Sequence, residues 1–143
     1  GWSYKYARRQ WNLVDNKELD YHYLGDFDKQ MLKVIKSQKD FIKTPVQEIW
    51  HNDGDQVLAF MRGDLIFVFN FSPTTSYTDY GFLVPTGAYN VVLNTDASEF
   101  GGNNLADDEV THLTNYDPLY VADRKEWLKL YIPARSAVVL RKN

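Results

Sequence analysis

The sequence contains no cysteine, which excludes disulfide scaffolds, thiolate metal sites and cysteine nucleophiles. No apolar run exceeds the length of Leu65 to Phe69, whereas a membrane helix needs roughly 18 residues. Basic residues are not in excess, since 16 Lys and Arg stand against 19 Asp and Glu and the pI is about 5.5. We therefore predict no membrane span and no nucleic-acid partner.

What the chain does have is a globular composition. Of its 143 residues, 44% are hydrophobic and 15% are aromatic, which is typical of a soluble domain with a proper core. The chain begins at Gly1, with neither an initiator methionine nor a signal peptide. We expect a piece of a longer, cytoplasmic protein.

Charge and periodicity both change near Pro45. Residues 1–43 contain nine basic and six acidic residues, whereas residues 44–143 contain seven and thirteen. In the first part, apolar residues recur at helical spacing from Leu19 to Met31, after a capping residue at Asp15. A shorter helix is predicted over residues 3–11. Residues 1–45 are thus predicted to be a helical segment that ends at the proline.

After Pro45 the apolar period becomes two, which indicates strands. They are predicted at Val57–Met61, Leu65–Phe69, Ser76–Leu83, Ala88–Asn94, Leu128–Ile132 and Ser136–Arg141. Turns are predicted at Asn52–Asp55 and Arg62–Asp64. The fold class is mainly β, an antiparallel β-sandwich of Greek-key type over residues 46–143, with the helical segment packed on it. Phe67 and Phe69 are predicted in the sandwich core, on one strand face with Leu65 and Phe71.

Few residues suggest chemistry. The three histidines His22, His51 and His112 are scattered without metal-ligand spacing, so a structural or surface role is favoured. Asn70-Phe71-Ser72 matches a glycosylation acceptor, but it ends a predicted buried strand, and a chance match is favoured. No cofactor or metal site is predicted.

The acidic run Asp107, Asp108 and Glu109, in a predicted polar loop, could bind a cation or supply an acid/base pair. Adjacent carboxylates are poorly placed to flank a glycosidic bond, and no apolar wall would raise either pKa. A solvated loop is favoured.

The most informative constellation lies on one strand. Alternation over residues 127–132 places Trp127, Lys129 and Tyr131 on the outer face and the residues between them on the core face. Trp127 and Tyr131 would stand about 13 Å apart along the strand and could stack on sugar rings, with Trp50 as a further contact. The alternative is that the helical segment or a missing domain covers this face, and we favour it because exposed aromatic patches usually mark protein contacts.

Specific strings of the sequence resemble glycogen (1,4-α-glucan) branching enzymes. Near the N-terminus they are Trp2-Ser3-Tyr4, Ala7-Arg8-Arg9-Gln10-Trp11 and Tyr23-Leu24-Gly25-Asp26-Phe27-Asp28. Further along they are Asn70-Phe71-Ser72-Pro73, Ser76-Tyr77-Thr78-Asp79-Tyr80, Asn94-Thr95-Asp96-Ala97-Ser98-Glu99-Phe100-Gly101-Gly102 and Tyr131-Ile132-Pro133-Ala134-Arg135. The strings span nearly the whole chain in the right order. The sequence departs from the family pattern at Gly81, where an Arg commonly stands.

The resemblance implies the following reading. Family members belong to the α-amylase superfamily and transfer α-1,4-glucan segments to form α-1,6 branches, by retaining chemistry on a (β/α)₈ barrel. None of the catalytic motifs occurs here, so no catalytic residue is assigned. Residues 1–45 would be the end of the barrel, and residues 46–143 a non-catalytic C-terminal β domain whose partner is that barrel.

Two alternatives to this reading stay open. The chain could be an autonomous module that binds α-glucan through Trp127, Tyr131 and Trp50. Far less favoured, it could be an enzyme that uses Asp107, Asp108 or Glu109.

Overall fold

The computed structural model describes residues 33, 36, 43–95 and 110–143. The predicted helices before residue 33, the docking of this segment on the sandwich, and the acidic run at Asp107 lie outside the described residues. The described elements are β1 (Gln47–Asn52), β2 (Val57–Arg62), β3 (Leu65–Asn70), β4 (Tyr77–Pro85), β5 (Ala88–Asn94), β6 (Thr111–Leu113), the 3₁₀ helix η3 (Pro118–Asp123), β7 (Lys125–Ile132) and β8 (Ser136–Lys142).

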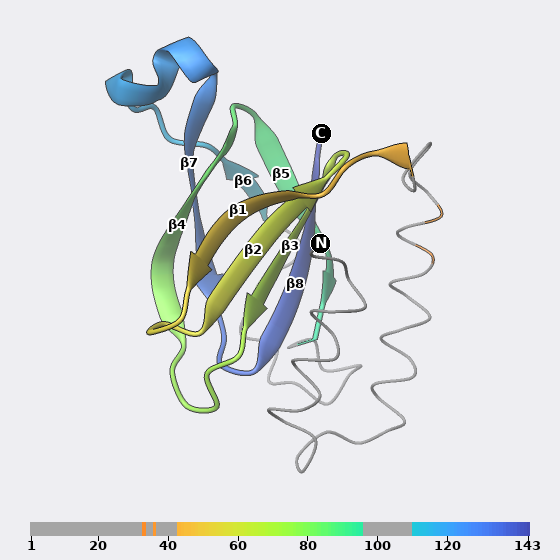
Figure 1. The fold of residues 1–143 in the computed structure, drawn as a ribbon, viewed down its shortest axis with the longest axis vertical. Coiled ribbons are helices and arrows are strands. Elements are labelled where there is room, and N and C mark those ends of the chain that lie inside the picture. Colours follow the sequence, from red (N-terminus) through yellow and green to blue (C-terminus); the bar gives the residue numbers. More distant parts are fainter. Residues whose placement is uncertain (1–32, 34–35, 37–42, 96–109) are drawn as a thin grey trace.

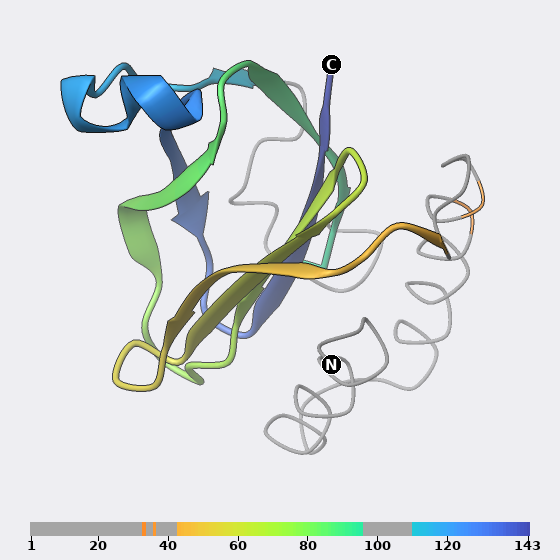
Figure 2. The same cartoon turned by 45° about the horizontal axis from the view of Figure 1, so that its top comes forward.

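These strands form two packed antiparallel sheets (Figures 1 and 2). The larger sheet has the strand order β1-β2-β3-β8-β5-β6, and the smaller one pairs β4 with β7. Each neighbouring pair of strands runs antiparallel. The predicted fold class, an antiparallel β-sandwich, is confirmed for residues 46–95 and 110–143.

The two predicted turns are also confirmed. Gly63 adopts a φ of 62° in the two-residue connection of β2 to β3, a left-handed conformation that glycine adopts without strain. In the turn after β1, the side-chain oxygen of Asn52 accepts a hydrogen bond of 2.8 Å from the backbone N–H of Asp55.

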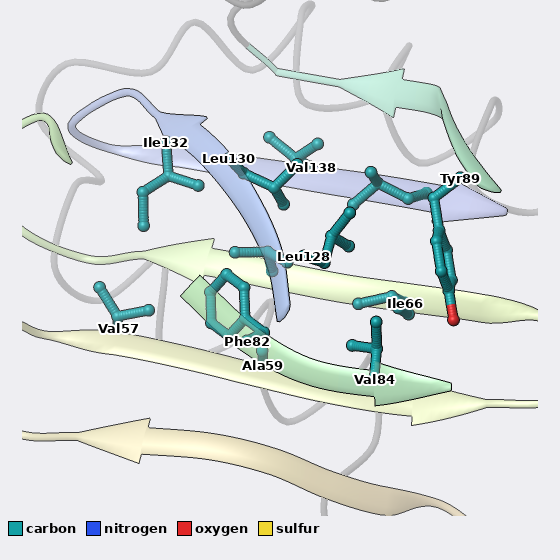
Figure 3. Packing of buried hydrophobic residues seen from close by; sticks show 12 residues of the cluster. Val57, Ala59, Ile66, Phe82, Val84, Tyr89, Leu128, Leu130, Ile132 and Val138 are labelled. Atoms are coloured by element: carbon teal, nitrogen blue, oxygen red, sulfur yellow. The ribbon is translucent and has the colours of Figure 1, made fainter. Parts of the chain in front are cut away.

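The buried core between the two sheets is built of apolar side chains together with the ring of Tyr89 (Figure 3). From β7 it receives Leu128, Leu130 and Ile132, each at most 4% exposed, as the alternation predicts. The remaining buried members of this inter-sheet core are Val57, Ala59, Ile66, Val68, Phe82, Val84, Tyr89, Val138 and Leu140. The hydroxyl of Tyr89 donates a hydrogen bond of 2.7 Å to the carbonyl of Pro85.

The prediction for Phe67 and Phe69 was right about their burial and about the strand face that they share with Leu65 and Phe71, but wrong in placing that face between the two sheets. Both are at most 1% exposed, but they belong to a second cluster on the face of the large sheet turned away from β4 and β7. Phe60 stacks on the two rings at centroid distances of 4.8 Å and 6.0 Å. Because both faces of this sheet are buried, β3 is apolar at every position except Asn70, and alternation alone does not tell which face meets the second sheet.

Asn70 joins two loops at one end of the sandwich. This side chain is fully buried, and its amide nitrogen donates to the carbonyls of Thr75, Ile132 and Pro133 at 2.9, 3.2 and 3.1 Å. Its amide oxygen accepts from the backbone N–H of Ser72 at 3.0 Å. The β3–β4 loop is thereby fastened to the β7–β8 turn.

Three elements were not predicted. β1 carries only one apolar aliphatic residue, Ile49, at a register shift opposite β2, so its pattern is not that of a strand with a buried face. β6 is three residues long, and η3 contains no buried residue. All three lie at edges or ends of the sandwich, where little side-chain burial marks the sequence.

None of the described helical residues forms a helix of the length and apolarity that crossing a bilayer requires.

Candidate functional site

The outer face of β7 presents the side chains that alternation predicts. Lys129 and Tyr131 are exposed, Tyr131 at 36%, and Trp127 stands on the same face, half-buried. On β4, Leu83 lies directly opposite Trp127 and Gly81 opposite Lys129. Trp127 and Tyr131 therefore share one surface of the small sheet, but only Tyr131 is open to solvent in the way that a stacking platform requires.

Trp127 is partly covered by η3. Its indole N–H donates a hydrogen bond of 2.8 Å to Oδ2 of Asp117, the residue that caps η3. The ring of Tyr120 meets the indole edge-on, with centroids 6.0 Å apart and an interplanar angle of 90°, a favourable aromatic geometry. The sequence favoured cover by the N-terminal helical segment or by a missing domain, whereas the contacts that the structure describes on Trp127 come from η3 and its capping residue.

Gly81 makes room for the indole on β4. A Cβ atom at this position would lie 3.2 Å from Cε3 of Trp127, closer than ordinary van der Waals contact. Trp127 on β7 thus packs directly against Gly81 on β4. The large ring of Trp127 on β7 fills the space that the glycine on β4 leaves open.

Asp117 organises the start of η3. Oδ1 of this carboxylate accepts a hydrogen bond of 2.9 Å from the backbone N–H of Leu119, and Pro118 occupies the first position of the helix. The Leu119 N–H, and after it the Trp127 indole, lower the pKa of Asp117 below its ordinary value. The helix ends at Arg124, which adopts a left-handed conformation with φ of 53°.

Trp50 is placed elsewhere, on β1 at the edge of the large sheet. Its indole N–H donates to the hydroxyl of Tyr80 at 2.7 Å, and that hydroxyl donates to Oδ2 of Asp55 at 2.7 Å. Tyr80 packs against the inter-sheet core, and this burial, followed by the bond to Asp55, raises the pKa of Tyr80 to about 12. Trp50 is 41% exposed. It closes the gap between β1 and β4 and does not extend the outer face of β7.

A pocket beside η3 was missed by the sequence analysis. This η3 pocket has a volume of about 320 Å³ and is lined by Thr86, Tyr116, Asp117, Val121, Arg124, Lys125 and Glu126. Large apolar side chains stand open to solvent around it, with Tyr116 at 71%, Leu119 at 80% and Val121 at 52% exposed. Figures 1 and 2 show η3 at one end of the sandwich, beside the start of β7. The local signal was Asp117-Pro118, a helix-start pair followed by apolar residues.

The histidines serve local contacts where they are described. The Nε2 atom of His51 lies 2.6 Å from Oδ1 of Asp53 in the turn after β1, and His112 lies in β6. Among residues 43–95 and 110–143, no group of three His, Asp or Glu side chains is arranged to hold a metal ion.

Comparison with known proteins places the β strands in a family. A family profile described as "Alpha amylase, C-terminal all-beta domain" matches residues 49–143. The chain belongs to this family. The match begins within β1 and continues through β8, so it takes in the whole described sandwich except the first residues of its edge strand.

Several relatives are named 1,4-alpha-glucan-branching enzyme. The protein of Saccharomyces cerevisiae is 42% identical over 141 residues, which cover 98% of this chain and 20% of that protein. The protein of Candida glabrata is 43% identical over 96% of this chain and 19% of its own length, and that of Equus caballus is 38% identical over 97% and 20%. The chain thus spans about a fifth of the length of these relatives.

Among solved structures, an alpha-amylase from H. orenii aligns with 70% of this chain and 16% of its own chain, at 19% identity and a TM-score of 0.38.

Proposed function

We propose that this chain is the C-terminal region of a 1,4-α-glucan branching enzyme, and that it has no catalytic activity of its own. The observation that carries the proposal is the pattern of coverage. Relatives with that name match nearly all of the chain, whereas the chain matches only a fifth of them. Residues 46–143 are then the C-terminal β domain, and residues 1–45 the end of the catalytic barrel.

Two of the described carboxylates have structural roles, which fits a non-catalytic domain. Retaining transfer between glucans needs a nucleophilic carboxylate and an acid about 5–5.5 Å away, the acid with a raised pKa. Asp117 has a lowered pKa and is committed to Leu119 and Trp127. Asp55 holds the hydroxyl of Tyr80 in the turn after β1. Both carboxylates act as structural hydrogen-bond acceptors.

In the whole enzyme this domain would support the barrel. The large sheet provides a rigid body with both faces buried and with a dense aromatic layer on the side turned away from β4 and β7. We place the enzyme in the cytoplasm, in the synthesis of a branched glucan such as glycogen.

An activity assay tests this proposal. The purified chain is incubated with linear amylose, and new α-1,6 linkages are counted by debranching and chain-length analysis. We expect none, and we expect branching only from a longer protein that includes the preceding barrel. Formation of α-1,6 linkages by the chain alone would contradict the proposal, most clearly if Asp107→Asn or Asp108→Asn abolished it.

A second candidate function is autonomous binding of α-glucan through Trp127, Tyr131 and Trp50. The exposure of Tyr131 beside Lys129 on the outer face of β7 favours it. The partial cover of Trp127 and the separate position of Trp50 favour it less. Tyr131→Ala tests it, because this side chain is exposed and its removal leaves no cavity: loss of affinity for maltoheptaose would support a platform on this face.

A further inference from the structure

The η3 pocket has the mixed surface that a sugar ring requires. Its walls include the exposed ring of Tyr116 and the side chain of Val121, and its polar groups are those of Thr86, Arg124 and Glu126, together with Asp117 and Lys125. A pyranose ring presents apolar C–H faces and a rim of hydroxyl groups. An aromatic face can stack on the former, and charged side chains can bond the latter. The volume of about 320 Å³ lies at the lower end of ligand pockets, which span roughly 300–1,000 Å³.

Hydrogen bonds tie together the segments that surround the η3 pocket. Asn115 and Trp127 exchange two backbone hydrogen bonds of 2.7 and 3.0 Å, which tie the segment before η3 to β7. The hydroxyl of Thr114 donates to Oε1 of Glu126 at 2.5 Å. Across the end of the sandwich, the N–H and the hydroxyl of Thr86 both donate to the carbonyl of Arg124, at 3.1 and 3.2 Å. Such preorganisation lowers the entropic cost of binding.

Three charged side chains at the η3 pocket have hydrogen-bonding positions that the described residues leave unused. Neither Arg124 nor Lys125 forms an ion pair with another residue of the described ranges. A carboxylate offers about four acceptor positions, of which Glu126 uses one for Thr114. The η3 pocket is therefore lined by both donors and acceptors for sugar hydroxyls.

We propose that the η3 pocket binds a segment of linear α-1,4-linked glucan, stacked on Tyr116 and bonded by Arg124 and Glu126. The choice of sugar rests on the proposed function, whereas the choice of site rests on the pocket itself. The site differs from the outer face of β7, because neither Trp127 nor Tyr131 lines the η3 pocket. It would hold a glucan chain at the end of the domain while chemistry takes place elsewhere in the enzyme.

Maltoheptaose is the probe, titrated into the whole 143-residue chain by calorimetry and by amide chemical shifts. Tyr116→Ala is the test variant, because the side chain is 71% exposed and its removal leaves no cavity. We expect affinity to fall about tenfold or more, the effect of losing one binding hot spot. Tyr116→Phe should retain most of the affinity, since it keeps the stacking ring. Arg124→Gln should weaken binding without moving the melting temperature.

Tyr131→Ala tests the competing site, since this exposed tyrosine lies on the outer face of β7. If the glucan lies in the η3 pocket, this variant binds maltoheptaose as tightly as the unchanged chain does. If Tyr131→Ala abolishes binding and Tyr116→Ala does not, the glucan lies on the outer face and the pocket proposal is wrong. A β-1,4-linked probe, cellohexaose, that binds as tightly as maltoheptaose would also overturn the stated linkage.

Two further outcomes separate this proposal from the proposed function. If maltoheptaose does not bind at millimolar concentration, the pocket proposal fails, while the assignment as a non-catalytic C-terminal region stands on the activity assay. If the chain instead forms a concentration-dependent dimer that Leu119→Ser abolishes, the exposed apolar side chains serve a protein contact and the glucan proposal is overturned. Sedimentation velocity measures that dimer.

Discussion

Between the two sheets, β4 and β7 contribute side chains that are almost completely removed from water, whereas η3, which directly precedes β7, contains no buried residue. The first region is held by apolar contact and the second by hydrogen bonds to Asp117, Thr86 and Asn115. Burial of apolar area supplies most of the free energy of folding. Hydrogen bonds at the surface contribute less and fix geometry. The sandwich therefore supplies stability, and the η3 end supplies a shaped surface.

The largest effect is expected in the inter-sheet core. Phe82→Ala removes a ring that is 1% exposed and should lower the free energy of unfolding by about 3–5 kcal/mol, because the cavity cannot collapse fully. Urea unfolding followed by tryptophan fluorescence measures it. Leu119→Ala is the control: this side chain is 80% exposed, and a change beyond about 0.5 kcal/mol would show that η3 shares in the stability of the core.

An intermediate effect is expected where the two regions meet. Gly81→Val places branched carbons against the Trp127 indole, whose Cε3 already lies 3.2 Å from an ideal Cβ. The ring must move, and the cost should be about 1–3 kcal/mol, as for other overpacked sites. The emission maximum of Trp127 should shift to the red because the ring leaves Tyr120. Trp127→Ala should remove most of the penalty of Gly81→Val, and additive losses in the double variant would disprove this packing.

Alkaline pH should destabilise the inter-sheet core. Burial raises the pKa of Tyr80 and that of Tyr89 from 10.0 to about 12, so in the folded state both stay protonated where the unfolded chain ionises. Their contribution to stability is complete below pH 10 and is lost as the pH rises toward 12. Melting temperatures from pH 8 to 12 measure this. Tyr80→Phe should flatten the decline, and an unchanged decline would show that the Tyr80 hydroxyl is not protected on folding.

The smallest change in global stability is expected for Asp117→Ala. The substitution removes the acceptor for the exposed Leu119 N–H and for the half-buried Trp127 indole. Neither bond lies in the inter-sheet core, so the melting temperature should change little. Hydrogen exchange at the Leu119 amide should instead become much faster than in the unchanged chain. Because the pKa of Asp117 is lowered on folding, this anchor is complete above about pH 4 and weakens as the pH falls further. Unchanged exchange at Leu119 would show that Asp117 does not hold the helix.

The sequence predicted those parts of the fold in which burial is one-sided or turn chemistry is local. Period two over residues 127–132 placed Leu128, Leu130 and Ile132 inward, as the structure confirms. Gly63 identified its hairpin because a left-handed φ is needed there. On β3 alternation could not be used in this way, because Phe67 and Val68 are both apolar. The position of the second sheet alone determines that Val68, and not Phe67, packs between the two sheets.

The candidate site was predicted less well. Trp127 and Tyr131 do share a face, but Trp50 lies at a different edge, because β1 has no apolar period from which its neighbours could be inferred. The η3 pocket depends on the approach of Thr86 to Arg124, which are 38 residues apart. Such long-range contacts leave no local pattern. The Asp117-Pro118 pair alone marked the start of a helix, and it gave no hint of a cavity.

Asn70 has a further consequence for any version of this chain made in a secretory compartment. Asn70-Phe71-Ser72 has the form of an acceptor for N-linked glycans, but the nitrogen that would carry the sugar is fully buried and already donates to the carbonyls of Thr75, Ile132 and Pro133. A glycosylated nitrogen keeps a single N–H, and no space remains for a sugar. Modification and the native loop arrangement are therefore mutually exclusive, so a glycan found on Asn70 would report molecules that were modified before they folded.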